Sequence, residues 1–189
     1  MNPERNAMFV ELTEADGLVL DLRYAGANNI AGRPIYRRAV ALLHAVARER
    51  LLATAARAGA MGLRLKIFDA FRPLEAQQAF WALLPDPRFV ADPSQGGIHP
   101  RGVAVDLTLV AASDGAELDM GTGFDAMTPA SAHASLDVPA EALRNRALLL
   151  GLMTATGWSS TPHEWWHYNL PDFSAFPPMR AADVPNGPM

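Results

Sequence analysis

The sequence contains no cysteine, no long hydrophobic run and no excess of basic residues. Without cysteine the chain has no disulfide, no thiol nucleophile and no thiolate metal site, so any bound metal must be held by histidine and carboxylate side chains. No apolar stretch approaches the roughly 20 residues that span a bilayer, which argues against a membrane span. The first six residues lack a basic start followed by an apolar core, so no secretory signal is visible and we expect a cytoplasmic protein.

The composition is typical of a globular enzyme. Half of the 189 residues are hydrophobic and 19% are charged, which is enough apolar material to bury a sizeable core. We therefore predict one domain over residues 1–189, with a proline-rich irregular tail at 171–189. The net charge of -4 and the lack of lysine or arginine clusters argue against a nucleic-acid partner, and the composition leaves the oligomeric state open.

Hydrophobic periodicity predicts three helices and at least two strands. Apolar residues recur at helical spacing in the segments 39–58, 73–81 and 139–157. Gly59 stands where a left-handed C-cap would end the first helix. The segment 63–67 alternates with period two, and the segment 103–109 is a mainly apolar run that contains Asp106, so both are predicted as strands.

Three segments are rich in glycine, proline and short polar residues, namely 24–34, 85–97 and 111–137. These residue types favour turns, so we predict loops in all three. A long loop inside a globular domain is often a lid or a specificity loop. We expect 85–97 and 111–137 to border a pocket.

Residues 163–167 read His-Glu-Trp-Trp-His and form the pattern H-E-x-x-H. On a helix this pattern places two histidines four residues apart to bind zinc, with the glutamate as general base. A capping-box pattern at 161–164 favours a helix, whereas the aromatic residues are strand formers and Pro171 limits a helix to about two turns. No histidine or glutamate follows His167 as a third ligand, so we disfavour this zincin interpretation.

A second interpretation takes the other ligands from upstream. His99 and Asp106 flank a tight turn that leads into the strand at 103–109, and a sheet can place that strand beside one carrying His167. Two imidazoles and a carboxylate leave the fourth tetrahedral position of zinc open to water, as a catalytic site requires. Glu164 is then the general base. Because a regular strand would put Glu164 and His167 on opposite faces, we expect a turn or bulge between them.

Three motifs resemble those of a known peptidase family. Residues 97–106 match its S-x-H-x-x-G-x-A-x-D box, except that Gly97 stands in place of the serine, and residues 164–167 match its E-W-W-H signature. Residues 69–73, Asp-Ala-Phe-Arg-Pro, are similar to its D-x-Y-R-P segment with phenylalanine for tyrosine. The family is that of the zinc D-alanyl-D-alanine dipeptidases, the VanX-like branch of the D,D-peptidases. The resemblance covers most of the chain, from about Leu22 to Leu170.

The resemblance assigns a cofactor and catalytic roles. It implies one zinc ion per chain, held by His99, Asp106 and His167. It also implies that Glu164 is the general base. Arg72, in the motif at 69–73, is implied as the cation that faces the developing oxyanion.

The substrate implied by the resemblance is the small dipeptide D-Ala-D-Ala, hydrolysed to two D-alanines in cell-wall dipeptide turnover or in resistance to cell-wall-directed antibiotics. Asp125 and Tyr24 are implied to hold its free amino group. We predict a single α+β domain, built on a mainly antiparallel sheet with packed helices and a zinc site at one end.

Two departures and two rival functions accompany this prediction. Gly97 removes a serine hydroxyl, and His163 is an additional histidine that creates the H-E-x-x-H pattern. One rival function is that of a related zinc D,D- or L,D-peptidase acting on longer peptidoglycan peptides. The other is that of a zinc-bearing binding module without catalysis, against which the presence of both Glu164 and Arg72 argues.

Overall fold

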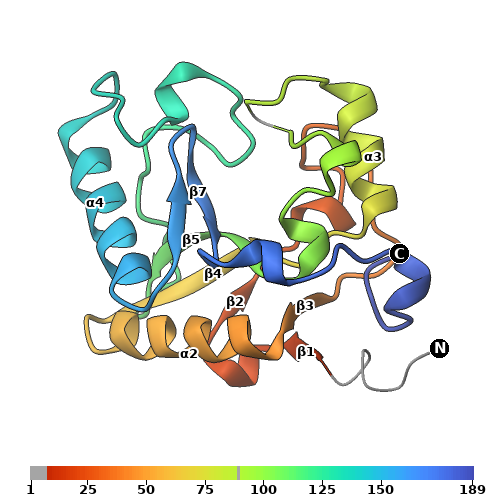
Figure 1. Cartoon of the computed structure of the whole chain (residues 1–189). Helices are drawn as coiled ribbons and strands as arrows, with labels where there is room; N and C mark the ends of the chain where they lie inside the picture. The colour runs from red at the N-terminus through yellow and green to blue at the C-terminus, as the bar shows by residue number, and fades with distance from the viewer. Residues whose placement is uncertain (1–7, 89) are drawn as a thin grey trace.

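The computed structural model describes residues 8–88 and 90–189 and contains two sheets (Figure 1). The strands are β1 (Phe9–Leu12), β2 (Val19–Leu20), β3 (Ala41–His44), β4 (Leu63–Asp69), β5 (Ala104–Ala111), β6 (Ser159–Thr161) and β7 (Glu164–Asn169). The larger sheet has the order β2-β4-β5-β7-β6, and the smaller one pairs β1 with β3. β2 runs parallel to β4 and the other pairings are antiparallel, which confirms the predicted α+β fold with a mainly antiparallel sheet.

Three α-helices accompany the sheets in the described part of the chain. They are α2 (Ala45–Gly59), α3 (Leu74–Leu83) and α4 (Ala140–Thr154). α2 packs on β4 and on α4, and α4 packs on β6 and β7, so the core includes Leu51, Leu107 and Leu149. α3 lies on the side of the molecule opposite α4 (Figure 1). Within residues 8–88 and 90–189, every helix is too short or too polar to cross a bilayer.

The helix predicted over 39–58 begins later than its apolar spacing indicates. Residues 41–44 form β3 instead, with all four side chains buried and each residue paired with β1. A short apolar run does not by itself distinguish a buried strand from a helix, and pairing with β1 decides for the strand. The His44 imidazole then caps α2 by accepting a backbone N–H (3.4 Å). Gly59 is the last helical residue, and the left-handed turn falls at Gly62 (φ 73°).

The pairing of β4, β5 and β7 aligns three polar side chains in one row across the sheet. β4 places Asp69 opposite Asp106 after an irregularity in the ladder, and β5 pairs Asp106 with His167 on β7. All residues of β5 except the last are buried. A row of polar side chains in such a buried sheet is costly unless the side chains bind one another or a ligand.

The segments predicted as loops are irregular. Segments 85–97 and 111–137 consist of turns, bends and single 3-10 turns in their described residues, apart from Ala111, which ends β5, and an isolated bridge at Glu117. The tail 171–189 is irregular too, but it packs against the rest of the chain. The N–H of Met179, for example, donates to a carbonyl in the turn that precedes β5 (2.8 Å).

Candidate metal centre and active site

His99, Asp106 and His167 converge on one point, although 68 positions separate the first from the last. His99 belongs to a 3-10 turn that precedes β5, whereas the other two lie on the paired strands β5 and β7. His99 Nε2 lies 3.1 Å from His167 Nδ1 and 3.2 Å from Asp106 Oδ2. His167 Nδ1 lies 3.0 Å from Asp106 Oδ1. All three side chains are buried, and their ligand atoms are close enough together to hold one metal ion.

These spacings fit a small divalent cation with nitrogen and oxygen ligands. Zinc bonds of about 2.0–2.2 Å in a tetrahedron place neighbouring ligand atoms about 3.3–3.6 Å apart. The triangle of ligand atoms is a few tenths of an ångström narrower than that, so small side-chain rotations suffice to admit the ion. Three protein ligands leave the fourth position to water or substrate. The residues present therefore fit a catalytic zinc site.

The protonation of these side chains also suits metal binding. His99 Nδ1 donates to the carbonyl of Ala70 (2.7 Å), which leaves the Nε2 lone pair facing the site. Burial lowers the pKa of His167, although Asp106 opposes it. Burial by itself would raise the pKa of Asp106, but the two imidazoles outweigh burial and the pKa lies well below its ordinary value. The carboxylate and the His167 ring thus have the deprotonated forms that bind metals.

The β6–β7 hairpin decides between the two interpretations of His-Glu-Trp-Trp-His. Residues 164–169 form a strand, and the turn at 162–163 leaves His163 exposed. His163 lies outside the metal-binding group of the described residues. The zincin interpretation, which needs a helix and His163 as a ligand, is therefore excluded.

The sequence profile of the D-Ala-D-Ala dipeptidases matches residues 5–184. The chain belongs to the D-Ala-D-Ala dipeptidase family. This match confirms the resemblance that the three sequence motifs indicate. It spans the three metal-site residues as well as Glu164 and Arg72, so the dipeptidase motifs and the geometric site coincide.

D-alanyl-D-alanine dipeptidases of two named organisms align with this chain along most of their length. The D-alanyl-D-alanine dipeptidase of Escherichia coli strain K12 is 44% identical over 160 residues, which cover 85% of this chain and 82% of that protein. The one from Streptomyces coelicolor is 34% identical over 182 residues, covering 82% of this chain and 86% of that protein. A solved structure of a mutant of the vancomycin resistance D,D-pentapeptidase VanY with Zn(II) aligns over 71% of this chain and 76% of that one, with 17% identity and a TM-score of 0.45. The VanY likeness is too distant to bear on the site.

Glu164 reaches the dipeptidase site through a bulge in β7. The β6–β7 register shifts so that Thr161 pairs with Glu164, and Glu164 and His167 both line one cavity. The sequence predicts this departure from a regular strand. Burial and then the negative charge of Asp106 raise the pKa of Glu164 well above its ordinary value, while Arg72 opposes them. A carboxylate with a raised pKa is a better proton acceptor, as a general base requires.

Arg72 is held at the edge of the metal site by three hydrogen bonds. Its Nε donates to Asp69 Oδ2 (2.9 Å) and its Nη2 to Asp106 Oδ2 (3.2 Å). Its Nη1 donates to Gln77 Oε1 (3.3 Å), and its Cζ lies 5.0 Å from the centroid of the Tyr24 ring. A fixed cation that touches a metal-binding carboxylate and lines the cavity is placed to stabilise negative charge there.

Asp125 and Tyr24, both predicted to hold the substrate amine, contact each other. The Tyr24 hydroxyl donates to Asp125 Oδ1 (2.9 Å), whereas Asp125 Oδ2 is buried and has no hydrogen-bond partner in the described residues. Among those residues Asp125 is also the one non-glycine with a positive φ (61°), a conformation that costs of order 1 kcal/mol and persists only when its surroundings hold it. Burial raises the pKa of Asp125 to about 6, against the opposing effect of Arg72.

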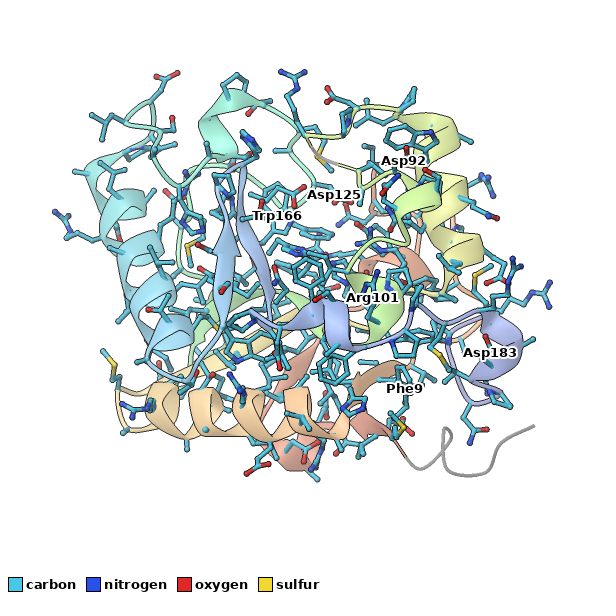
Figure 2. All side chains as sticks on the ribbon, viewed as in Figure 1. Phe9, Asp92, Arg101, Asp125, Trp166 and Asp183 are labelled. Atoms are coloured by element: carbon cyan, nitrogen blue, oxygen red, sulfur yellow. The ribbon has the colours of Figure 1, made fainter. Side chains whose placement is uncertain are left out.

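A cavity of about 240 Å³ joins the metal site to Asp125. Asp125 and Trp166, labelled in Figure 2, line it from the loop 111–137 and from β7. The loop 85–97 contributes to the wall as well, as predicted. In the described part of the chain, Gly97 lies outside the cavity wall, and its φ of 61° is one that serine rarely adopts. The backbone conformation at position 97 therefore favours glycine over the serine of the family motif.

The structure adds residues that the sequence interpretation leaves without a role. Asp69, which begins the D-x-Y-R-P-like motif, accepts from the Tyr36 hydroxyl (2.7 Å) as well as from Arg72. Gln77 joins Arg72 to the loop 85–97 by donating to the carbonyl of Ala91 (2.8 Å). A motif marks Asp69, whereas Tyr36 and Gln77 lie outside every motif and are revealed by their contacts.

Proposed function

We propose that this protein hydrolyses the free dipeptide D-Ala-D-Ala to two molecules of D-alanine, with a zinc ion held by His99, Asp106 and His167. The observation that carries the proposal is one small cavity lined by the metal-site residues, by Glu164 and by Asp125, whose carboxylate has one oxygen without a hydrogen-bond partner in the described residues. Membership of the family and the names of the relatives supply the identity of the dipeptide. We also propose that the reaction takes place in the cytoplasm without a nucleic-acid partner.

The mechanism divides the chemistry among fixed side chains. A zinc ion held by His99, Asp106 and His167 would supply an activated water nucleophile and a positive charge. Glu164 takes the proton that this water loses and transfers it to the leaving amine, a role worth roughly 10²–10⁴ in rate. Arg72 stays charged at every working pH and pairs with the negative oxygen that develops on the carbonyl. Because Asp69 and Gln77 hold its guanidinium, this charge is in place before the reaction begins.

Asp125 provides selectivity for a free amino terminus. The Tyr24 hydroxyl occupies Oδ1, so Oδ2 is the atom that accepts from the substrate ammonium. A charge-assisted hydrogen bond there replaces the water that burial removed from the carboxylate. An acylated or extended amino terminus has no such charge and leaves Oδ2 unpaired, which costs about 1–3 kcal/mol.

Three substrates test the proposed function: free D-Ala-D-Ala, N-acetyl-D-Ala-D-Ala and a peptidoglycan-type pentapeptide that ends in D-Ala-D-Ala. We expect kcat/KM for the free dipeptide to exceed both of the others by about 10- to 100-fold, because only its ammonium pairs with Asp125. A preference for the pentapeptide would establish the rival peptidase function. No turnover of any of the three by zinc-loaded protein would establish the binding module.

The substitution Asp125→Asn is expected to weaken substrate binding and to stabilise the metal-free protein. Asparagine tolerates the left-handed backbone and can still accept from Tyr24, but it has no charge for the ammonium. KM for the free dipeptide should rise about 10- to 100-fold, while N-acetyl-D-Ala-D-Ala should hardly be affected. Because the pKa of Asp125 is raised from 3.8 to about 6, removal of its buried charge should stabilise the fold by about 3 kcal/mol at pH 7.5.

The pH dependence of this stability difference tests its cause. A raised pKa means that the folded protein binds a proton more readily than the unfolded chain, so ionised Asp125 destabilises the fold above pH 6. As the pH falls through 6 towards about 4, Asp125 takes up a proton and the advantage of Asp125→Asn should shrink by more than half. Thermal unfolding of both metal-free proteins at about pH 7.5 and 4.5 measures it. If the wild type and Asp125→Asn were equally stable at the higher pH, Asp125 would not carry a destabilising buried charge.

A further inference from the structure

Arg146 is a buried cation that takes no part in the reaction described above. It lies on α4 and is 2% exposed. No carboxylate of the described residues forms an ion pair with its guanidinium within 4.0 Å. Burial lowers its pKa, with Asp119 opposing. A buried charge without an ionic partner is costly, and an apolar side chain of similar volume often gives a fold that is at least as stable. Stability alone therefore does not account for Arg146, and its role is sought in its hydrogen bonds.

The guanidinium joins the two ends of the loop 120–132, Met120 on one side and Ala130 to Ala132 on the other, which we call the neck of the loop. Its Nε donates to the carbonyl of Met120 (2.7 Å), and its Nη1 donates to the carbonyls of Ala130 (2.9 Å) and Ala132 (3.1 Å). Carbonyls from both ends of the loop therefore meet at one planar group with donors in fixed directions. In this irregular part of the chain, Arg146 supplies donors that a sheet or helix would otherwise provide.

A chain of hydroxyl groups continues from Arg146 to the residue beside Asp125. Arg146 Nη2 donates to Thr122 Oγ1 (3.4 Å), which lies 3.0 Å from Ser131 Oγ. Ser131 donates its single hydroxyl hydrogen to the carbonyl of Ala126 (2.5 Å), so Thr122 is the donor to Ser131. The last bond holds the peptide between Ala126 and Met127, one residue beyond the left-handed Asp125.

The tip of the same loop reaches the substrate cavity. Phe124 lies edge-on to Trp166, with ring centroids 5.6 Å apart, and Asp125 lines the cavity. Trp165, which precedes Trp166 on β7, donates its indole N–H to the Thr122 hydroxyl (2.8 Å). In Figure 1 this segment is the green-to-turquoise trace between β5 and α4. The neck of the loop is thus tied both to α4 and to the strand that carries the general base.

We propose that Arg146 is a positioning residue for the substrate amine: by closing the loop 120–132, it holds Asp125 where the ammonium group binds. This inference rests on the proposed function, in which Asp125 Oδ2 accepts from the ammonium. With the neck open, the backbone of Asp125 relaxes from its φ of 61° towards a more common conformation and the carboxylate moves. The metal-site residues and Glu164 lie on other elements, so the loss falls on substrate binding.

Arg146→Met, Asp125→Asn and the double variant form a cycle that tests this coupling. We expect Arg146→Met to raise KM for free D-Ala-D-Ala about tenfold or more, with kcat changed less than about threefold and zinc content unchanged. In the Asp125→Asn background, the same substitution should change KM less than about twofold, because the carboxylate that Arg146 positions is gone. Equal penalties in both backgrounds, or a wild-type KM for Arg146→Met, would overturn the proposal.

Two further variants separate positioning from folding. Arg144→Met removes an exposed arginine from the same helix and should leave KM unchanged. Ser131→Ala removes the bond to Ala126 with little loss of volume, and should raise KM less than Arg146→Met but with the same dependence on Asp125. If Arg146→Met does not fold, a wild-type KM for Ser131→Ala overturns the proposal. Failure of the proposed function looks different, because the wild type would then not hydrolyse the dipeptide or Asp125→Asn would leave KM unchanged.

Discussion

Glu164→Gln is expected to lower kcat for D-Ala-D-Ala by roughly 10²–10⁴ while leaving the zinc ion bound. Glutamine has nearly the same shape, so the cavity keeps its volume, but it cannot take a proton from water at neutral pH. Glu164 is not one of the three metal-site residues, so retention of zinc separates loss of the base from loss of the site. KM should change little, because the lost interaction is made in the transition state.

Steady-state kinetics and metal analysis of the same samples measure both effects of Glu164→Gln. The control is Glu141→Gln, which removes an exposed carboxylate near the start of α4 and should leave kcat and zinc content unchanged. A kcat for Glu164→Gln within about tenfold of the wild type would mean that another group is the base. Loss of zinc from the variant would instead place Glu164 among the ligands.

Removal of zinc with a chelator is expected to reduce hydrolysis to below about 1% without unfolding the protein, and returned zinc should restore it. The fold persists because hydrogen bonds already hold two of the metal-site residues, His99 to the carbonyl of Ala70 and Asp106 to Arg72. Zinc at about 100 times its Kd adds about 2.7 kcal/mol to the free energy of unfolding. For a chain of this size that raises Tm by about 5–10 °C.

Two substitutions test which residues bind the zinc ion. Asp106→Asn removes the negative charge from the group of three and should weaken zinc binding together with activity. His163→Ala removes the exposed histidine that completes the H-E-x-x-H pattern, and should leave zinc content and kcat unchanged. Metal analysis, activity and the zinc-dependent shift in Tm distinguish the two variants. Loss of zinc from His163→Ala with full zinc in Asp106→Asn would contradict the assigned site.

Much of the candidate site can be predicted from the sequence because few residue types suit its chemistry. A chain without cysteine and with five histidines has few ways to hold zinc, and an aspartate inside an apolar strand is costly unless it binds something. His99 and His167 are two of these five histidines, and Asp106 is the aspartate inside the apolar strand. Their identities depend on local patterns, and local patterns can be read along a single chain.

Secondary structure is harder to predict where local preference and strand pairing compete. Residues 41–44 continue the helical spacing of the following segment, and residues 161–164 resemble the start of a helix. Residues 41–44 form a strand because β1 pairs with them. Thr161 pairs with Glu164 across the β6–β7 hairpin, and β5 pairs with β7 further along, at residues 167–169. β1 and β5 are both far from their partners in sequence, so no local window contains these two pairings.

The sequence by itself determined the kinds of ligand available, the three helices, the central strands β4 and β5, most of the loops, and the family to which the chemistry belongs. Only the tertiary structure decided that His163 lies outside the metal-binding group, that one oxygen of Asp125 has no hydrogen-bond partner among the described residues, and that Gln77 and Arg146 bind Arg72 and the ends of the loop 120–132. Residue identity and periodicity are properties of neighbours along the chain. Convergence depends instead on strand register and on packing between distant segments, which are settled when the whole chain folds.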